Sequence, residues 1–200
     1  MNVVAFAASP RAGGNSETLL DEVIAGLREA DIAVRKIRTH ELDIEPCRGC
    51  FECRTLGRCV IDDSFRGIRD SLIACDGVVF ASPLYFMNVP AKGKAVIDRF
   101  QAFWVAKNQL RTDPFGGRRR YGLLVACSGK HHGPENAPIF RGIEDTLWSA
   151  FNALGVEPLE PLLVSGVDTY GQVLERPQVL EEARQRGRQM AQCIRMCHVL

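Results

Sequence analysis

The sequence predicts an α/β fold in which a five-stranded parallel sheet carries helices on both faces, forming a three-layer sandwich. Apolar strand patterns alternate with amphipathic helix patterns along the 200 residues, which is typical of a doubly wound sheet with right-handed crossovers. The clearest strands are apolar throughout, as expected where both faces of a parallel sheet are covered. No repeat or break in composition divides the chain, so we expect one domain over residues 1–200.

The first strand, loop and helix show the pattern most clearly. An unbroken apolar run over residues 3–8 predicts a buried strand, and a polar loop containing two glycines follows it. The periodicity after this loop predicts an amphipathic helix. Its apolar face is formed by Leu19, Leu20, Val23, Ile24 and Leu27.

The remaining elements follow in alternation. Strands are predicted over residues 33–38, 77–82, 121–126 and 156–164, the last in spite of Pro158 and Pro161. Helices are predicted from a cap at Asp62 or Asp63, from Pro90 to residue 100, and over residues 139–154 and 178–198. Long loops are expected over residues 39–60 and 104–119.

Composition excludes several classes of protein. The net charge is +1 and charged residues make up 24% of the chain, so bulk charge gives no argument for nucleic acid or membrane binding. The run Arg118-Arg119-Arg120 is short, and we interpret it as a solvated loop. No apolar run approaches the roughly 20 residues that span a bilayer, and no signal peptide pattern is present. We therefore expect a cytoplasmic protein whose eight cysteines are not paired in disulfides.

The loop after the first strand has the features of an anion site. Ligands of doubly wound sheets bind beyond the carboxyl ends of the strands, where backbone N–H groups at a helix start stabilise negative charge. Ser9, Ser16 and Thr18 add hydroxyl donors, and Arg11 adds a planar cation. The alternative is an ordinary turn in which Ser16 merely caps the helix.

The loops after the third and fourth strands lie at the same predicted edge. Tyr85, Phe86 and Met87 stand between two prolines and suit the face of a planar ring. Ser128 and Gly129 offer backbone and hydroxyl donors for the edge of a ring. A phosphate site beside a site for a flat heterocycle describes flavin mononucleotide (FMN), although core packing is the alternative for the aromatic pair.

A cluster of cysteines lies in the long loop. Cys47, Cys50, Cys53 and Cys59 have the spacing C-x2-C-x2-C-x5-C, which can wrap an iron–sulfur cluster. Zinc is disfavoured, because structural zinc sites usually use two separated pairs of ligands. A metal-free loop packed beside the flavin stays open as an alternative. The other cysteines are expected to be buried in helices or strands; they are Cys75, Cys127, Cys193 and Cys197.

Three motifs in this order resemble the NAD(P)H-dependent FMN reductases of the flavodoxin-like superfamily, and the cysteine run resembles their iron–sulfur flavoprotein branch. The motifs are Ser9-Pro-Arg-x-x-Gly-x-Ser, Ser82-Pro-Leu-Tyr-Phe followed by Lys94-Ala-Val-Ile-Asp98-Arg99, and Cys47-Arg-Gly-Cys50-Phe-Glu-Cys53 with Cys59-Val-Ile-Asp62-Asp63. The resemblance covers about the first 130 residues and implies a flavodoxin-like fold, FMN as cofactor and NAD(P)H as electron donor.

The resemblance also assigns residues. It implies that the FMN phosphate is bound by Ser9, Arg11, Asn15 and Ser16. It implies that the ribityl chain and isoalloxazine are contacted by Pro83, Leu84, Tyr85, Phe86 and Asn88, with Ser128 and Gly129 completing the ring pocket. A [4Fe–4S] cluster would be held by Cys47, Cys50, Cys53 and Cys59.

We therefore expect an FMN-dependent oxidoreductase that needs no general acid or base of its own, because the flavin carries the chemistry. With a cluster, electrons would pass singly between it and FMN, and the chain would be an electron-transfer flavoprotein that can serve a redox partner protein. The alternatives are a redox-inert flavin- or phosphate-binding module and a redox-sensing partner protein that uses the cysteine loop for contact.

Other residues suggest a helix ion pair, a substrate contact and a subunit interface. Lys94, Asp98 and Arg99 have the spacing of an ion pair on a helix surface. His131 and His132 are candidates for contacting substrate. We expect the loops over residues 39–60 and 104–119 to meet a second subunit in a homodimer or homotetramer, with Phe103 and Trp104 as candidate interface aromatics.

Overall fold

The structure is a computed structural model that describes residues 1–130 and 138–198. Its sheet contains β1 (Asn2–Ala7), β2 (Ala33–Arg38), β3 (Gly77–Pro83), β4 (Tyr121–Ser128), β5 (Glu157–Pro158) and β6 (Leu162–Ser165). The strand order is β2-β1-β3-β4-β5, with β6 also paired to β4, and every pairing is parallel. This is the flavodoxin-like order, and the prediction of that fold class is confirmed.

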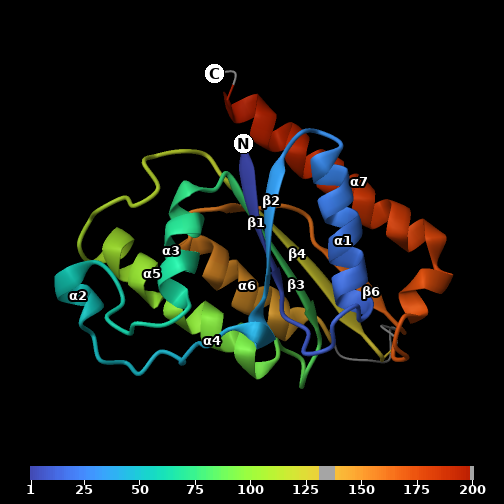
Figure 1. Ribbon diagram of the computed structural model, residues 1–200, viewed down its shortest axis with the longest axis horizontal. Coiled ribbons are helices and arrows are strands. Elements are labelled where there is room, and N and C mark those ends of the chain that lie inside the picture. The colour runs from blue at the N-terminus through green and yellow to red at the C-terminus, as the bar shows by residue number, and fades with distance from the viewer. Residues whose placement is uncertain (131–137, 199–200) are drawn as a thin grey trace.

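Helices cover both faces of the sheet (Figure 1). One face carries α1 (Asn15–Arg28) and α7 (Pro177–His198); the other carries α3 (Phe65–Ala74), α4 (Ala91–Arg99), α5 (Gln101–Asn108) and α6 (Arg141–Ala153). Alternate side chains of β1 enter the two apolar clusters, with Val4 and Phe6 on one side and Val3 and Ala5 on the other. The strands are apolar throughout because both of their faces are buried.

The helices α1 and α7 pack with unusually close backbones. A Cβ atom at Gly26 would lie 2.0 Å from the carbonyl oxygen of Arg184, and one at Gly187 would lie 2.2 Å from that of Val23. Only glycine permits this approach. The contact fixes α1, whose N-terminus bears the first loop.

The last predicted strand is not continuous. Residues 157–158 and 162–165 both pair with β4 and are separated by a break that contains Pro161. Proline has no N–H to donate to a neighbouring strand, so the ladder is interrupted there. The expectation of one strand over residues 156–164 is corrected to two short ones.

The two predicted long loops contain helical turns. The first holds η1 (Thr39–Glu41) and α2 (Cys53–Leu56), and the second begins only after α5 ends at Asn108. Phe103 on α5 is 2% exposed and packs in the core, so the expectation that it is an interface residue is wrong. Trp104 beside it is 40% exposed. Helix η2 (Gln172–Glu175) precedes α7.

The arginine run after this loop is only partly solvated. Arg120 is 1% exposed and donates hydrogen bonds to the carbonyl oxygens of Cys75, Leu154 and Leu72. Arg118 donates to the carbonyl oxygen of Ile73 at 2.6 Å. These carbonyls lie at the ends of α3 and α6, where helices leave acceptors unpaired. They therefore accept the hydrogen bonds of the buried Arg120 guanidinium. The expectation of a solvated run holds for Arg118 and Arg119, which are both exposed, and is wrong for Arg120.

None of the helices within the described residues is both long enough and apolar enough to cross a membrane.

Candidate functional site

The loop between β1 and α1 presents the start of a helix at the carboxyl edge of the sheet. The Ser9 hydroxyl accepts a hydrogen bond from the Arg11 N–H at 3.0 Å and lies 3.1 Å from the Arg11 carbonyl oxygen, which closes a tight turn. Gly14 precedes the helix, and no side chain caps it. Ser16 therefore does not act as the cap, and the positive end of α1 can stabilise an anion placed there.

A buried carboxylate holds this loop from behind. Glu17 is 1% exposed, accepts a hydrogen bond from the Gly13 N–H at 2.9 Å, and forms ion pairs with Lys36 and Arg38 of β2. Burial opposes ionisation of Glu17, but hydrogen bonds from Lys36, Arg38 and the Gly13 N–H outweigh it and lower its pKa to about 2. The carboxylate is thus charged at neutral pH and fixes the backbone of the loop.

A small polar cavity of about 140 Å³ opens beside the loop. The Arg11 side chain reaches this cavity and is exposed, and within the described part of the chain no carboxylate pairs with it. The lining residues are Ser9, Arg11, Gly14, Asn15, Ser16, Pro83, Leu84, Tyr85, Cys127, Gly129, Val167, Asp168 and Tyr170. Helix N–H groups, a hydroxyl and a free guanidinium make this cavity suitable for a phosphate.

A wider cleft of about 630 Å³ adjoins the small cavity. The two share Leu84, Gly129 and Asp168. The cleft is lined by Leu84, Phe86, Met87, Ser128, Gly129, Lys130 and Asp168. An anion site next to an open cleft with apolar and aromatic walls matches a ligand that has a phosphate at one end and a flat ring at the other.

A strained turn forms one wall of the cleft. Tyr85 and Asn88 exchange backbone hydrogen bonds of 2.8 and 3.0 Å, and the two residues between them have positive φ, +50° at Phe86 and +65° at Met87. Residues with side chains rarely adopt this conformation. The turn points Phe86 entirely into solvent, with 103% relative exposure. Strain that presents a bare aromatic ring beside a cleft is typical of a ligand-binding feature.

The structure places most of the residues that the sequence suggested for FMN at these two cavities. Ser9, Arg11, Asn15, Ser16, Pro83, Leu84 and Tyr85 line the small cavity, Phe86 and Ser128 line the cleft, and Gly129 lines both. Asn88 lines neither, because its amide donates to Thr146 at 3.0 Å and its side-chain oxygen accepts from the Val89 N–H. His131 and His132 lie outside the described residues.

Sequence reasoning missed one wall of the small cavity. The segment after β6 contributes Val167, Asp168 and Tyr170, and Tyr170 donates a hydrogen bond to the Ala12 carbonyl at 2.8 Å. Asn15 is the link, because its amide donates to the carbonyls of Val167 and Thr169 at 3.1 and 2.9 Å. The position of this segment after the last strand could have indicated it, because every loop that follows a strand of a parallel sheet lies at this same edge.

Cys127 lies at the floor of the small cavity and is 4% exposed. Burial raises the pKa of its thiol to about 12, and hydrogen bonding with Ser16 lowers it only in part. A neutral buried thiol is neither a nucleophile nor a metal ligand at neutral pH. The packing role expected for Cys127 agrees with this placement, and Cys75 is likewise buried.

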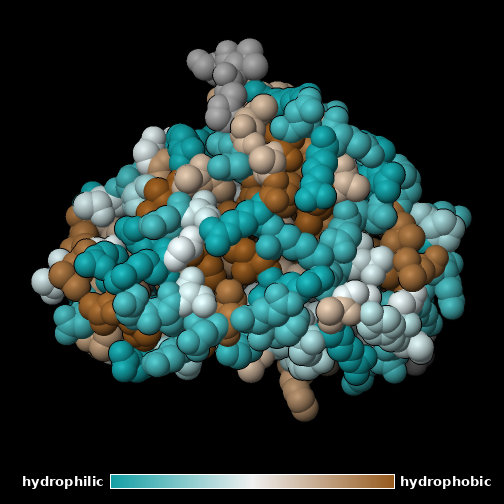
Figure 2. Space-filling model, in the orientation of Figure 1, coloured by the Kyte–Doolittle hydropathy of each residue, from teal (hydrophilic) through white to brown (hydrophobic). Residues whose placement is uncertain are grey.

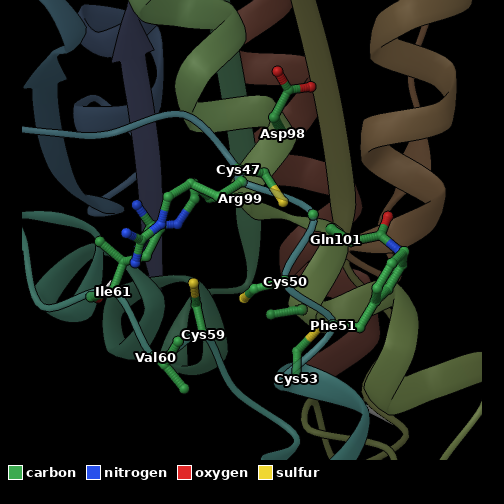
Figure 3. Close-up of a pocket in the computed structure, with 13 residues that line it drawn as sticks. Cys47, Cys50, Phe51, Cys53, Cys59, Val60, Ile61, Asp98, Arg99 and Gln101 are labelled. Carbon is green, nitrogen blue, oxygen red and sulfur yellow. Dashed lines mark hydrogen bonds between the residues drawn. The ribbon is translucent and has the colours of Figure 1, made fainter.

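The cysteine loop surrounds a third cavity of about 250 Å³. Figure 3 shows Cys47, Cys50, Cys53 and Cys59 around this space, with Arg99 of α4 at its side. The loop relies on left-handed backbone at Gly49 and at Phe51, where φ is +61°. Figure 2 shows apolar side chains on the surface over this segment, which includes the exposed Phe51 and Leu56.

The donor set of the third cavity consists of four cysteine thiols, which are the ligands that iron–sulfur clusters use. Among the described residues, no three histidine, cysteine or carboxylate side chains meet closely enough to hold one metal ion. An iron–sulfur cluster asks for something different, because each thiolate binds a different iron. All four cysteines are free thiols that line one cavity. Burial raises the pKa of the Cys53 thiol. Thiols bind iron as thiolates, so the cysteines would release protons on binding.

The interpretation of Lys94, Asp98 and Arg99 as an ion pair on the helix surface is wrong for Arg99. Lys94 and Asp98 do form the expected pair on the surface of α4, with 2.6 Å between Nζ and Oδ1. Arg99 instead is 1% exposed and pairs with the buried Asp63 at 2.6 and 3.1 Å. Burial lowers the pKa of Arg99, but the Asp63 carboxylate and the Cys59 sulfur outweigh it, so the guanidinium stays charged. Asp63, rather than Asp62, also accepts from the Phe65 N–H at the start of α3.

A flavodoxin-like sheet with an anion site and an adjoining ring cleft at the carboxyl ends of its strands defines the class of FMN-binding flavoproteins. Residues 1–138 match the NADPH-dependent FMN reductase family, and the chain belongs to that family. Membership implies an FMN-dependent, flavin reductase-like oxidoreductase.

Curated relatives carry a more specific name. The chain is 28% identical over 139 residues to an iron-sulfur flavoprotein of Methanosarcina thermophila, which covers 70% of this chain and 69% of the relative. It is 34% identical over 99 residues to an iron-sulfur flavoprotein of Archaeoglobus fulgidus, covering 50% and 45% of the two chains. These are similarities at moderate identity over part of each chain.

Solved structures support the fold. The chain superposes on RosB, solved with a bound flavin phosphate intermediate, with a TM-score of 0.72 at 12% identity, covering 98% of this chain and 79% of that one. An NAD(P)H:quinone oxidoreductase of Methanothermobacter marburgensis gives 0.66 at 18% identity, with 94% of both chains covered. A flavone reductase gives 0.69 at 16% identity, and this chain spans 63% of its length. At these identities the likeness shows the fold alone.

Proposed function

We propose that the protein is an NAD(P)H-dependent FMN oxidoreductase that binds the phosphate of FMN in the small cavity and its ring in the adjoining cleft. The observation that carries this proposal is the Arg11 guanidinium, which has no carboxylate partner among the described residues and lies beside the open start of α1, at the edge of the larger cleft. When bound, FMN supplies the hydride and electron chemistry of the reaction. The chain itself needs only to bind, orient and shield that group.

Each wall has a distinct part in this proposal. Arg11, Ser9 and the first turn of α1 bind the phosphate. Leu84 and Gly129, which line both cavities, lie along the path of the ribityl chain. The turn with Phe86 and Met87 provides a flat apolar surface for the ring, and the backbone at Ser128 offers donors to its edge.

The substitution Arg11→Ala tests the phosphate assignment. It should weaken FMN binding by about 10-fold or more and leave riboflavin, which has no phosphate, unaffected, since one charge-assisted contact to an anion contributes roughly 1.5–3 kcal/mol. Fluorescence quenching of each flavin measures both affinities. Arg28→Ala is the matched control, because Arg28 is an exposed arginine in the last turn of the same helix. Equal affinity of wild type and Arg11→Ala for FMN would refute the assignment.

We further propose that Cys47, Cys50, Cys53 and Cys59 hold a [4Fe–4S] cluster. Support comes from four free thiols around one cavity and from the names of the curated relatives. Protein prepared without oxygen should contain iron and acid-labile sulfide, and Cys50→Ser should lose most of both. Cys193→Ser on α7 is the control and should lose neither. A wild-type protein that contains FMN but no iron after anaerobic reconstitution would leave the metal-free loop as the correct alternative.

The electron donor is part of the same proposal. Under anaerobic conditions, NADPH or NADH should bleach the bound flavin within seconds to minutes if the protein is a reductase. Flavin that bleaches with dithionite but with neither nucleotide would favour the alternative of an electron carrier that receives electrons from a partner protein.

A further inference from the structure

Arg99 has one donor that the protein does not satisfy. Its guanidinium carries five N–H groups. Nη1 donates to the Glu45 carbonyl at 2.9 Å and to Asp63 Oδ2 at 2.6 Å; Nη2 donates to Asp63 Oδ1 at 3.1 Å and to the Ile61 carbonyl at 3.3 Å. Four of the five are thereby used. The fifth, on Nε, is buried and has no acceptor among the described residues.

An unpaired buried donor on a cation is rare, because both the donor and the charge lose solvation on burial. The four satisfied donors hold the guanidinium plane rigidly, so Arg99 cannot rotate to find water without breaking them. The Arg99 Nε–H therefore needs an acceptor from outside the polypeptide, or a cysteine thiolate where the structure has a thiol.

The surroundings of Arg99 indicate what that acceptor is. Arg99 lines the cavity of the four cysteines and lies beside Cys59 (Figure 3). The Cys59 sulfur acts electrostatically on the guanidinium, but it does not accept a hydrogen bond from Nε. The Asp63 carboxylate is committed to Arg99 and to two backbone N–H groups, at Glu45 and Phe65. A sulfur anion in this cavity would satisfy the free donor.

We propose that Arg99 is a positioning residue for the centre bound by the cysteines, and that its Nε–H donates a hydrogen bond to a sulfur anion there, either the Cys59 thiolate or a sulfide. The proposal rests on the cluster proposed above. A cation and a donor at this place stabilise added negative charge, so Arg99 makes the centre easier to reduce. The Asp63 carboxylate and the two carbonyls fix the guanidinium at the wall of the cavity.

The direct test is pulsed electron paramagnetic resonance on reduced protein grown with isotope-labelled arginine. We expect a coupling between the cluster and an arginine nitrogen in the wild type, its loss in Arg99→Lys, and its survival in Arg48→Lys. Arg48 is the matched control because it lines the same cavity but its side chain is 60% exposed. A purely structural role of Arg99 would produce no such coupling.

The reduction potential provides a second readout. In Arg99→Lys the cluster should be at least 10-fold harder to reduce, a fall of about 59 mV for a one-electron couple, with iron content unchanged. Arg48→Lys should shift the potential much less. If Arg99→Lys does not fold, the coupling in wild type and in Arg48→Lys still decides the question.

The outcomes separate the two proposals. Absence of iron and sulfide from the wild type refutes the cluster and with it this inference. A cluster that assembles but shows no arginine coupling, or whose coupling is lost in Arg48→Lys, refutes the role of Arg99 and leaves the proposed function standing.

Discussion

Glu17 shows at the scale of one residue how the loop between β1 and α1 is held in place. The carboxylate is buried against this loop, yet it stays charged because Lys36, Arg38 and the Gly13 N–H surround it. Glu17 does not line the small cavity, and its ion pairs with Lys36 and Arg38 neutralise its charge. The loop is therefore held rigid without cancelling the positive field at the start of α1.

The lowered pKa of Glu17 predicts an acid-sensitive contribution to stability. Its pKa is about 2 in the folded protein against 4.5 when unperturbed, so the contribution is complete above pH 4.5 and is lost as the pH falls toward about 2. The shift corresponds to about 3 kcal/mol. Glu17→Gln should lower the free energy of unfolding by up to this amount at pH 7 and show a weaker acid dependence over that window. Urea unfolding at a series of pH values measures both; parallel curves for the two proteins would contradict the account.

A substitution in the strained turn should have opposite effects on stability and on FMN binding. Phe86 has positive φ and no packing to lose, so Phe86→Asn should stabilise the flavin-free protein by about 1 kcal/mol, because asparagine tolerates this backbone. The same change should weaken FMN binding, because the ring loses an aromatic neighbour. Thermal unfolding and FMN titration measure the two effects. Phe51→Asn is the control, since Phe51 is also exposed with positive φ but belongs to the cysteine loop and should leave FMN affinity unchanged.

Buried arginines are the residues that sequence reasoning could not place. Charge and position on a helix indicated a surface ion pair for Arg99, and three adjacent arginines indicated a solvated loop for Arg120. Both are 1% exposed because their acceptors come from segments more than 30 positions away in the chain. Local periodicity carries no information about such partners. The cavity residues of the first loop were predictable because strand, loop and helix are contiguous in sequence.

At the scale of elements, the segment after β6 and the start of α1 form one unit. Asn15 joins them through the carbonyls of Val167 and Thr169 and through the Val173 N–H. This wall was not predicted, because its contact with the first loop spans 152 positions or more. The split of the last strand has a local cause, because Pro161 lies in the break between β5 and β6 and cannot donate to the ladder.

Removal of the Asn15 side chain tests this unit. Asn15→Ala leaves buried backbone groups without partners and should reduce the free energy of unfolding by roughly 1–3 kcal/mol. FMN affinity should fall as well, because the wall that holds Asp168 and Tyr170 loses its anchor. Chemical unfolding and flavin titration provide the measurements. Asn108→Ala, at an exposed helix end, is the control and should change neither; a loss of stability without any loss of FMN affinity would show that the wall does not contribute to binding.

For the whole molecule, the alternation of apolar strands and amphipathic helices was sufficient to predict the sheet and its covering. Right-handed crossovers leave few arrangements for five parallel strands, and the flavodoxin-like arrangement among them was implied by the family resemblance. The pattern could not indicate where the cysteine loop lies relative to the helices. Its cavity uses Asp98 and Arg99 of α4 together with residues 47–61, and only the folded chain brings these together.

The same scale carries a prediction about assembly. Phe86 projects fully into solvent at the edge of the cleft, and a second copy of the chain would cover it and the bound ring. We expect sedimentation to show a dimer or tetramer that retains FMN, and dilution to the monomer to release the flavin. A monomer that holds FMN tightly would contradict this expectation.

The central claim is that the two adjoining cavities bind FMN, and the visible absorption spectrum of protein purified without oxygen tests it most directly. The account predicts a yellow to brown protein with flavin bands, and with additional broad absorption where the cluster is present. A colourless protein that takes up no FMN on titration would contradict it.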